Sequence, residues 1–524
     1  MTTTPVRALH RLAWRDVRRG GLAVAVVAGG VTGLVAATYE QTVRRIVDPA
    51  ALAALAANPA VRTLFGPPVL DDPGGFTVWR TGPPLGVLLG VWAILTVTRI
   101  GRGAEEAGRW TLLLAGRVPL ATVVAGQLAV VATVAVLAGA AAAGALVLAG
   151  TALSGAVLHG AGLALTGICF AATATVAAQV LPTRSAATGA AVALLAAAVL
   201  ARMAGDGVPG LAGLRWITPF GLAALARPYR TGTALPLLVL AAAVAVLAVA
   251  GPLLAARRDA GGSLLRPRGS RPPRRRTVRS LPGFAVRRLL PPLAGWAAGL
   301  VPFSLLVGLL AGSMTRFLAG NTAIAELAGQ AGFGGLARVT GYTAVLYALL
   351  ANPIGAFCVV RLTAVAADET AGRLTLLLAA PVTRVRYVAV ETAATAAGAT
   401  GLAAAAGVAA GAGAGLPPGQ ALAGALNALP VALLSLGAAV FALGWAPGWV
   451  AGLGLLPTAG GFLLLTLARS AGAPPWVVGL SPFAHLAPVP DTGPDIPATA
   501  IMLTAAAALI AVGAAGYRRR DLRR

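Results

Sequence analysis

Stretches of about 20 apolar residues, each long enough to cross the hydrocarbon core of a bilayer as a helix, recur along this chain. The sequence is 58% hydrophobic and only 11% charged, whereas about a quarter of the residues of a soluble domain are charged. We therefore predict an all-α integral membrane protein with about twelve transmembrane helices. The alanine- and glycine-rich run at 385–412 is the least regular span and could bend or break. The expected spans lie near residues 21–38, 82–98, 120–149, 154–180, 186–204 and 235–255, and near 290–312, 339–360, 385–412, 419–445, 449–468 and 498–516.

The basic residues predict how these spans are oriented. All 41 are arginine, and with the N-terminus in the cytoplasm 30 of them fall in cytoplasmic segments and 11 outside. This asymmetry follows the positive-inside rule and predicts that both termini are cytoplasmic. The net charge of +25 then reflects topology and contact with anionic lipid. The arginines are dispersed and no nucleic-acid reader motif accompanies them, so we expect the lipid bilayer as a partner and no nucleic acid.

A basic, proline-broken stretch divides the chain. Residues 257–280 read RRDAGGSLLRPRGSRPPRRRTVRS, a composition typical of a solvated tether. Regulation or lipid binding by the same stretch is the alternative. We predict a first six-helix half at 1–256, a cytoplasmic linker at 257–283 and a second six-helix half at 284–524.

The two halves resemble each other in sequence. Three separated landmarks of the first half recur in the second at nearly one spacing, which indicates an internal repeat. Because six helices per half start both copies inside, the repeats should be parallel, related by an axis along the membrane normal, and form a pseudo-dimer. The landmarks are Gly108-Arg109 with Gly372-Arg373 at 264, Ile217-Thr218-Pro219-Phe220 with Leu480-Ser481-Pro482-Phe483 at 263, and Arg257-Arg258-Asp259 with Arg519-Arg520-Asp521 at 262.

One charged phrase occurs in both halves, between the second and third span. It reads AEEAGRWTLLLAGRVPL at 104–120 and DETAGRLTLLLAAPVTR at 368–384. In the first copy Glu105 precedes Arg109 by four residues, the favourable order for an ion pair on a helix. Apolar residues follow at helical spacing. We predict a short amphipathic helix on the inner membrane face in each half, with its charged side toward the cytoplasm. The second pair is Glu369 with Arg373, and the apolar stripes are Trp110, Leu113 and Leu114, and Leu374, Leu377 and Leu378.

An interfacial anchor would explain the leucines of these helices, but docking of a partner explains the whole phrase better. An anchor at an anionic leaflet favours arginine over glutamate, yet both copies keep an acid, a glycine and an arginine. Gly108 and Gly372 leave a notch that another backbone can approach. The residues predicted to couple to a partner are Glu105, Glu106, Gly108, Arg109, Asp368, Glu369, Gly372 and Arg373.

Few polar residues interrupt the spans, and these are candidates for a cavity or gate. Glu391 is the acid inside a predicted span, and placing an acid there costs about 2.5 kcal/mol or more, which favours a functional role. Gln127 stands 264 residues before it. The alternatives are that both face water at the cytoplasmic mouth or bond a neighbouring helix. Tyr342, Tyr347 and Asn352 are candidates to shape a pocket, although tyrosines near a membrane boundary are often interfacial anchors.

The sequence shows no pattern for catalysis, so we predict that the chain is not an enzyme and binds no metal or cofactor itself. Cys169 and Cys358 lie inside apolar runs and are expected as buried thiols, with a disulfide as the alternative. The three histidines are scattered, with no further ligand at metal-binding spacing. A Walker A loop requires a lysine that reaches the phosphates, and the sequence contains none. The chain therefore lacks the means to hydrolyse ATP alone.

The repeated phrase is similar to the coupling-helix signature Glu-x-x-Gly-Arg/Thr-x-x-x-Leu-Leu-x-x-Pro-Val-Ser/Thr-Arg of bacterial ABC exporter permeases. The fused double length and four further phrases resemble the actinobacterial exporters of polyketide antibiotics, the tetronasin-type group. The resemblance covers nearly the whole chain. It departs at Gly116-Arg117, where the second copy has Ala-Pro, and at Leu120, which stands at the place of Arg384, so the first coupling helix is expected to dock less tightly. The four phrases are NPAVRTLFGPP (58–68), LRWITPFG (214–221), GLSPFAHLAPVP (479–490) and YRRRDL (517–522).

This resemblance implies the membrane subunit of an ATP-driven exporter in the bacterial plasma membrane. A separate ABC ATPase subunit, in two copies, would bind ATP and Mg²⁺ and dock on the two coupling helices. The cargo would be hydrophobic: a polyketide antibiotic, a drug or a lipid-like molecule. The alternative is a secondary transporter driven by an ion gradient, with Glu391 as the proton carrier. Such a carrier has no use for two docking helices, and one intramembrane acid is sparse for a proton relay.

Overall fold

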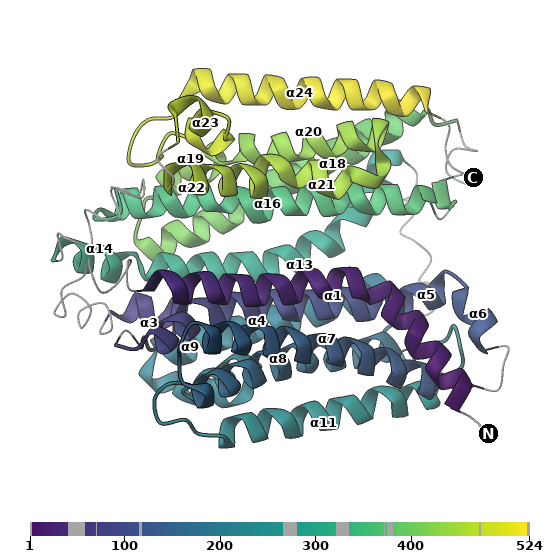
Figure 1. Ribbon diagram of the computed structural model, residues 1–524. Coiled ribbons are helices and arrows are strands. Elements are labelled where there is room, and N and C mark those ends of the chain that lie inside the picture. The colour runs from purple at the N-terminus through teal and green to yellow at the C-terminus, as the bar shows by residue number, and fades with distance from the viewer. Residues whose placement is uncertain are drawn as a thin grey trace. The chain divides into compact units, whose positions relative to one another are not determined.

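A computed structural model describes residues 3–39, 58–69, 71–114, 118–265, 280–320, 335–370, 372–374, 381–470 and 473–520. Throughout these ranges the regular elements are helices, without a β-strand. Twelve helices of the described part are long and apolar enough to span a membrane, which confirms the predicted all-α integral membrane class. The chain divides into two compact units, Met1–Arg271 and Pro272–Arg524, and each contains six of these helices (Figure 1).

The first unit is a bundle of long helices joined by short ones. Its membrane-length helices lie side by side along one direction (Figure 1). They are α1 (Thr3–Tyr39), α4 (Pro73–Ile100), α7 (Leu120–Leu148), α8 (Leu153–Val180), α9 (Arg184–Gly207) and α11 (Leu235–Ala256). The short elements are α3 (Pro59–Phe65), α5 (Arg102–Glu106), α6 (Arg109–Leu114), η2 (Pro209–Ile217) and α10 (Pro219–Leu225).

The second unit repeats this plan with two interrupted spans. Its membrane-length segments are α13 (Leu281–Leu309), α16 (Val339–Thr370), α18 (Arg384–Ala414), α19 with α20 (Pro418–Asn427, Leu429–Trp445), the run from η4 through α21 and η5 into α22 (Pro447–Trp449, Val450–Leu455, Leu456–Gly460, Gly461–Ser470), and α24 (Ile496–Arg519). Three short elements complete it: α14 (Ala311–Ala319), α23 (Pro475–Gly479) and η6 (Pro482–His485). The run at 385–412 is an unbroken helix, α18, because alanine is the strongest helix former.

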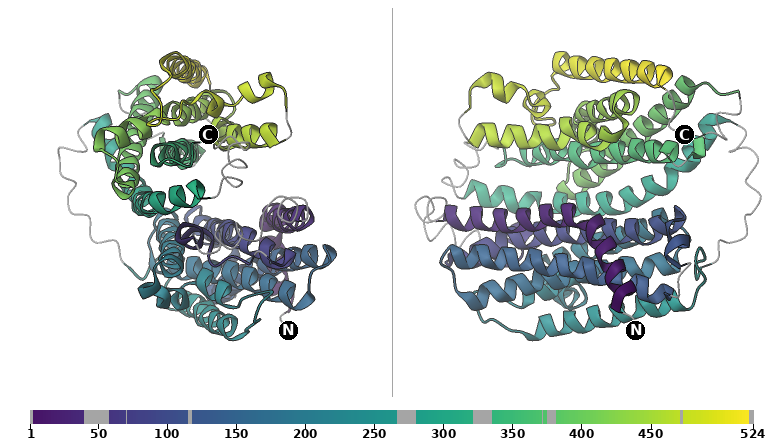
Figure 2. Two further views of the ribbon diagram at one scale, coloured as in Figure 1. Left: turned by 90° about the vertical axis from the view of Figure 1, so that its left-hand side faces the viewer. Right: turned by 45° about the vertical axis from the view of Figure 1, so that its right-hand side comes forward.

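Corresponding helices pack together in the two units. The first span packs along the third, α1 on α7 and α13 on α18. The second packs on the fourth, α4 on α8 and α16 on α20, and the sixth also lies on the fourth, α11 on α8 and α24 on α20. Figure 2 shows each bundle from two further directions. This common packing order supports the predicted repeat, which stays a prediction.

Glycine lets the main helix pairs approach closely. Where α7 crosses α8, a Cβ added to Gly160 would lie 2.6 Å from the carbonyl oxygen of Gly139. Where α20 crosses α24, a Cβ added to Gly513 would lie 2.5 Å from the carbonyl oxygen of Val440. Because lipid gives apolar surfaces little reason to associate, close van der Waals contact through small residues holds such helices together. The many glycines and alanines of the sequence therefore serve helix packing.

The Thr-Pro-Phe and Ser-Pro-Phe landmarks each begin a short helix with a hydroxyl cap, an α-helix in the first unit and a 3₁₀-helix in the second. The hydroxyl of Thr218 accepts the N–H of Gly221 at the start of α10, and the hydroxyl of Ser481 accepts the N–H of Phe483 at the start of η6. A hydroxyl cap followed by proline is a favoured way to begin a helix. The phenylalanines then enter their units, where Phe220 lies 5.6 Å from Phe170 between ring centroids. The sequence match thus reflects matching caps.

The predicted linker, residues 257–283, is partly folded at both of its ends. Residues 257–265 fold back on the first unit, because the N–H groups of Leu264 and Leu265 donate to the carbonyl oxygens of Gln179 and Val180 at the end of α8. At the other end α13 already begins at Leu281. Residues 266–279 lie outside the described part. Cys169 and Cys358 are buried free thiols, as expected.

Candidate functional site

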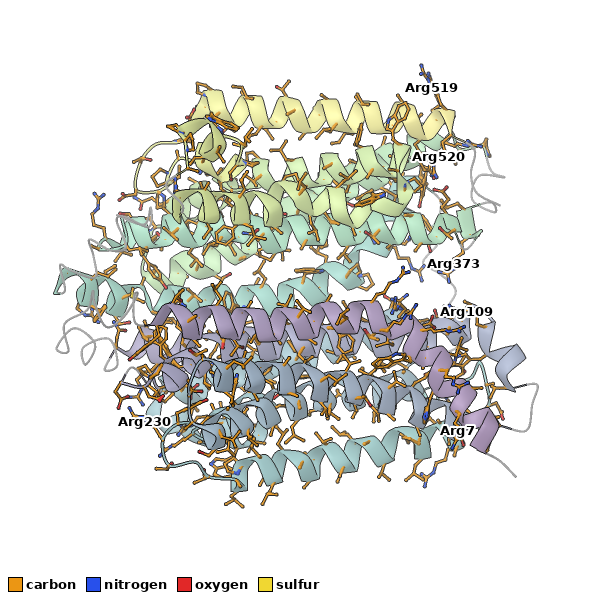
Figure 3. The ribbon with its side chains drawn as sticks, in the orientation of Figure 1. Arg7, Arg109, Arg230, Arg373, Arg519 and Arg520 are labelled. Carbon is orange, nitrogen blue, oxygen red and sulfur yellow. The ribbon has the colours of Figure 1, made fainter. Side chains whose placement is uncertain are left out.

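The repeated phrase forms a bent segment at the end of the second span of each unit. We call residues 101–119 the first elbow and residues 368–383 the second; residues 115–117, 371 and 375–380 of these segments lie outside the described part. In the first unit α4 ends at Ile100, and α5 and α6 follow before α7 begins. Figure 3 shows Arg109 at the same end of the first bundle as Arg7, with Arg230 at the opposite end. The elbow therefore lies at the end of the bundle where the chain starts.

A left-handed glycine bends each elbow between its acid and its arginine. Gly108 has φ +71° and Gly372 has φ +69°, a conformation that costs other residues about 1–2 kcal/mol. A Cβ at either position would meet no heavy atom within 4 Å. Both glycines are therefore required by backbone conformation, and they form no notch for a neighbouring backbone within the described part.

The bend also overturns the predicted ion pairs. Glu105 and Arg109 belong to separate short helices, α5 and α6, so the spacing of four residues does not bring them together. Glu105 instead pairs with Arg102 and Arg258, and Arg373 pairs with Asp368 at 3.1 Å. The expectation of Glu105–Arg109 and Glu369–Arg373 pairs on one continuous helix is wrong, because each glycine interrupts the helix between the two partners.

Glu105 points into the first unit and not toward its surface. Its side chain is 3% exposed and makes a two-point ion pair with Arg258, whose Nη1 and Nη2 lie 2.6 and 2.8 Å from Oε1 and Oε2. Arg102 Nη1 donates to Oε2 at 3.0 Å, and the N–H of Gly261 donates to Oε1 at 2.7 Å. Arg258 also donates to the amide oxygen of Gln179. The elbow is thereby fixed to the residues that follow α11.

Glu369 has the corresponding position in the second unit. Its side chain is 4% exposed, and Nη2 of Arg520 lies 2.7 Å from both of its carboxylate oxygens. Arg520 directly follows α24, the sixth span of this unit. Its backbone carbonyl accepts a hydrogen bond from Nη1 of Arg384 at 2.7 Å, a contact that Leu120 at the corresponding place cannot make. Arg373 and Arg520 are labelled at one end of the second bundle in Figure 3.

The sequence singled out the arginines that bind the two elbow acids, but only as part of a repeat and not as partners of these acids. Arg258 and Arg520 are members of the Arg-Arg-Asp landmark that recurs at 262 residues. That landmark indicated a repeat, but nothing in its spacing to Glu105 or Glu369 indicated contact. Only the packing of the sixth span brings the arginine that follows it to the elbow of the same unit.

Five of the six remaining coupling candidates are exposed, whereas Asp368 is partly buried between Arg288 and Arg373. Glu106, Gly108 and Arg109 are exposed in the first elbow, and Gly372 and Arg373 in the second. A carboxylate oxygen of Glu106 accepts the backbone N–H of Arg184 at 2.6 Å, at the start of α9. The elbows thus present one acid inward and keep their glycine and arginine on the surface.

The apolar side of the first elbow packs on protein. Trp110 is buried at 2% exposure, in a cluster that includes Val123 and Val124 of α7 and Ala255 of α11. Leu114, the last residue of the predicted first stripe, is partly buried against the same cluster. Leu374 is also buried in the second elbow. The side chain of Leu113, the residues Gly116-Arg117, and Leu377 and Leu378 lie outside the described part, so the second stripe is followed only at Leu374.

Glu391 lies buried between two arginines of neighbouring helices. Its Oε2 accepts from Nη2 of Arg361 at 2.9 Å, and its Oε1 lies 3.3 Å from Nη1 of Arg288. Arg288 also pairs with Asp368, which in turn pairs with Arg373. An unbroken series of charged contacts therefore leads from the second elbow into the bundle. Glu391 thus bonds neighbouring helices, as one of the sequence alternatives had it, while its role in a cavity or gate stays a prediction.

Gln127 has a simpler environment at the corresponding place in the first unit. Its amide Nε2 donates to the carbonyl oxygen of Ile100 at 2.9 Å, so it satisfies the end of α4. It too bonds a neighbouring helix. The charged series of the second unit thus corresponds to one neutral hydrogen bond here.

The tyrosines of the eighth span hold helices together. Tyr342 and Tyr347 are buried, and their hydroxyls donate to the carbonyl oxygens of Val307 in α13 and Gly407 in α18, at 3.1 and 3.3 Å. These positions differ from those of interfacial anchors, which keep their hydroxyl in water. Asn352 is partly buried, with its amide nitrogen 3.5 Å from the carbonyl oxygen of Leu349.

Within the described residues, twelve membrane-length helices in two units define a multi-pass integral membrane protein. A family model described as multidrug efflux system permease Rv1217c, C-terminal domain, matches residues 278–518. The multidrug efflux system permease protein Rv1217c of Mycobacterium tuberculosis (strain ATCC 25618 / H37Rv) is 32% identical over 491 residues, which cover 91% of this chain and 88% of the relative. The chain therefore belongs to the family of the multidrug efflux system permease Rv1217c.

Proposed function

We propose that this chain is the membrane subunit of an ATP-driven ABC exporter in the bacterial plasma membrane, with both termini in the cytoplasm. The observation that carries the proposal is the pair of elbows, each with an exposed glycine and arginine at the end of a second span. The name of the relative, a multidrug efflux system permease, supports outward transport of drugs. The cargo that fits is a hydrophobic compound, such as a polyketide antibiotic or a lipid-like molecule.

The motor of this exporter is a separate ABC ATPase subunit. The sequence has no lysine and therefore no Walker A loop, so ATP and Mg²⁺ belong to the partner. Two elbows favour two ATPase copies. Closure of the ATPase pair on ATP would move the elbows, and rigid-body movement of the bundles would then switch access from the inside to the outside.

In this proposal the exposed elbow residues contact the ATPase. Glu106 and Arg109 in the first elbow and Arg373 in the second can reach a partner directly, whereas Glu105 and Glu369 are occupied inside their own units. The arginines can bind carboxylates of the ATPase by charge-assisted hydrogen bonds.

Charge reversal tests the docking role. The permease is co-expressed with an ABC ATPase of the same genome, and the ATPase retained by wild type and by R109E/R373E is measured. We expect the double variant to lose the ATPase and its stimulation. The matched control is R230E, which reverses an exposed arginine at the opposite end of the first bundle (Figure 3). Normal ATPase binding by R109E/R373E would contradict docking at the elbows.

Transport in inside-out vesicles tests the energy source. We expect a panel of fluorescent hydrophobic drugs, including a polyketide antibiotic, to accumulate on addition of ATP and Mg²⁺. Uptake on a proton gradient without ATP would support the secondary transporter instead. Glu391 is a poor proton carrier in this geometry, because its protonation would leave the buried guanidinium of Arg361 without a counter-charge.

A further inference from the structure

Each unit contains a latch that joins its elbow to the end of its sixth span. The first latch is Glu105 with Arg258, and the second is Glu369 with Arg520. We propose that Arg258 and Arg520 are positioning residues for coupling: they make the sixth span follow the elbow when the ATPase moves it. This inference rests on the proposed function and assigns the acids of the repeated phrase an internal role in place of contact with the ATPase.

The geometry of the latches suits the transfer of movement. Both acids are nearly fully buried. Arg520 directly follows the sixth span α24, and Arg258 follows the sixth span α11 after one residue. Arg258 binds Glu105 through two nitrogens, and Arg520 contacts both oxygens of Glu369 through one. Contacts to both carboxylate oxygens fix direction as well as distance. A displaced elbow would therefore pull the end of the sixth span along a defined line.

Stability alone gives a weak reason for such a pair. Well-packed apolar residues in place of a buried ion pair are often as stabilising or more so. The same acid and arginine nevertheless occur at the same joint of both units, 264 and 262 residues apart. A shared mechanical role accounts for this recurrence.

The two latches differ in their further support. Glu105 also accepts from Arg102 and from the N–H of Gly261, and Arg258 is held by Gln179. Arg520 has the ring of Tyr517 5.4 Å from its guanidinium carbon, and within the described part Glu369 has Arg520 as its charged partner. Loss of Arg258 leaves Glu105 two donors, so the second latch should be the more sensitive one.

The test measures drug transported per ATP hydrolysed, in the permease–ATPase complex reconstituted in vesicles. Wild type is compared with R520Q, with R258Q and with R519Q, which removes the neighbouring exposed arginine as a matched control. We expect R520Q to bind the ATPase normally but to transport about tenfold less drug per ATP, within the usual range of coupling between sites. R258Q should lose less, and R519Q should equal wild type.

A second variant separates positioning from folding. E369M/R520M removes both charges, so we expect it to melt near the wild-type temperature while its transport per ATP stays low. Wild-type transport per ATP in this folded variant would overturn the proposal. If the double variant does not fold, R520K decides: we expect wild-type coupling, because one nitrogen of Arg520 makes both contacts, and loss of coupling would overturn the latch. Absence of ATP-driven transport by wild type would instead contradict the proposed function.

Discussion

Replacement of Glu391 by glutamine should reveal how much the buried charges of the second unit contribute to its stability. The carboxylate of Glu391 contacts two guanidiniums, but these are unequal. Arg288 is about a quarter exposed and keeps Asp368 and the hydroxyl of Tyr387 as partners. Arg361 is 6% exposed and, within the described part, keeps the carbonyl oxygen of Arg288 as its remaining acceptor. One guanidinium, not two, would thus lose its counter-charge.

The expected magnitude follows from this count. Removal of one partner of a buried ion pair costs about 3–5 kcal/mol. In E391Q a single guanidinium loses its counter-charge and keeps one acceptor, so we expect the unfolding free energy to fall by about 3 kcal/mol. The matched variant in the first unit is Q127L, which removes one hydrogen bond to Ile100 and should cost about 1 kcal/mol. The assay is unfolding of both variants in mixed micelles by titration with denaturing detergent.

A compensating variant sharpens the test. E391L/R361M removes the acid together with the arginine that depends on it, so it should recover most of the stability that E391Q loses. The reasoning is refuted if E391Q unfolds within about 1 kcal/mol of wild type, or if E391L/R361M is less stable than E391Q. E391Q that folds should also retain ATP-driven transport, because no proton passes through Glu391 in the proposed mechanism.

Two further predictions concern glycine. Gly372→Ala should cost about 1–2 kcal/mol through its left-handed backbone and also lower ATPase stimulation, whereas Gly415→Ala, at φ +72° beyond α18, should cost the same in unfolding free energy and leave stimulation unchanged. Equal ATPase stimulation by the two variants would show that the bend at Gly372 is not needed for coupling. Gly139→Val should reduce the folded yield, seen by size exclusion in detergent, because a Cβ there collides with the backbone of Gly160. Gly144→Val, on the same helix with open space at its Cβ, should fold normally, and equal yields would contradict the packing argument.

The membrane class and the number of spans were predictable from the sequence because they depend on local composition. A helix must cross about 30 Å of hydrocarbon with its own backbone hydrogen bonds satisfied, and each apolar run meets that requirement by itself. The α18 run shows this well, since its alanines favour a helix throughout. The repeated phrase was likewise visible because it is contiguous.

The pairing of the charges was not predictable in the same way. A spacing of four residues between Glu105 and Arg109 indicates contact only if one helix continues through both, and the positive φ of Gly108 prevents it. Glycine is compatible with either backbone region, so the sequence does not choose. Once the helix breaks, the partner of Glu105 depends on which other segment packs nearby, here the residues that follow α11.

The sequence by itself therefore determined a helical protein with twelve membrane-length spans in its described part, the place of the two elbows and the absence of a Walker A lysine. Only the tertiary structure decided that Glu105 and Glu369 turn inward to Arg258 and Arg520, and that Arg288 and Arg361 enclose Glu391. The physical reason is distance along the chain: spans form from neighbours in sequence, whereas these ion pairs join residues 30 to 153 positions apart. Such pairs exist only after the helices have packed.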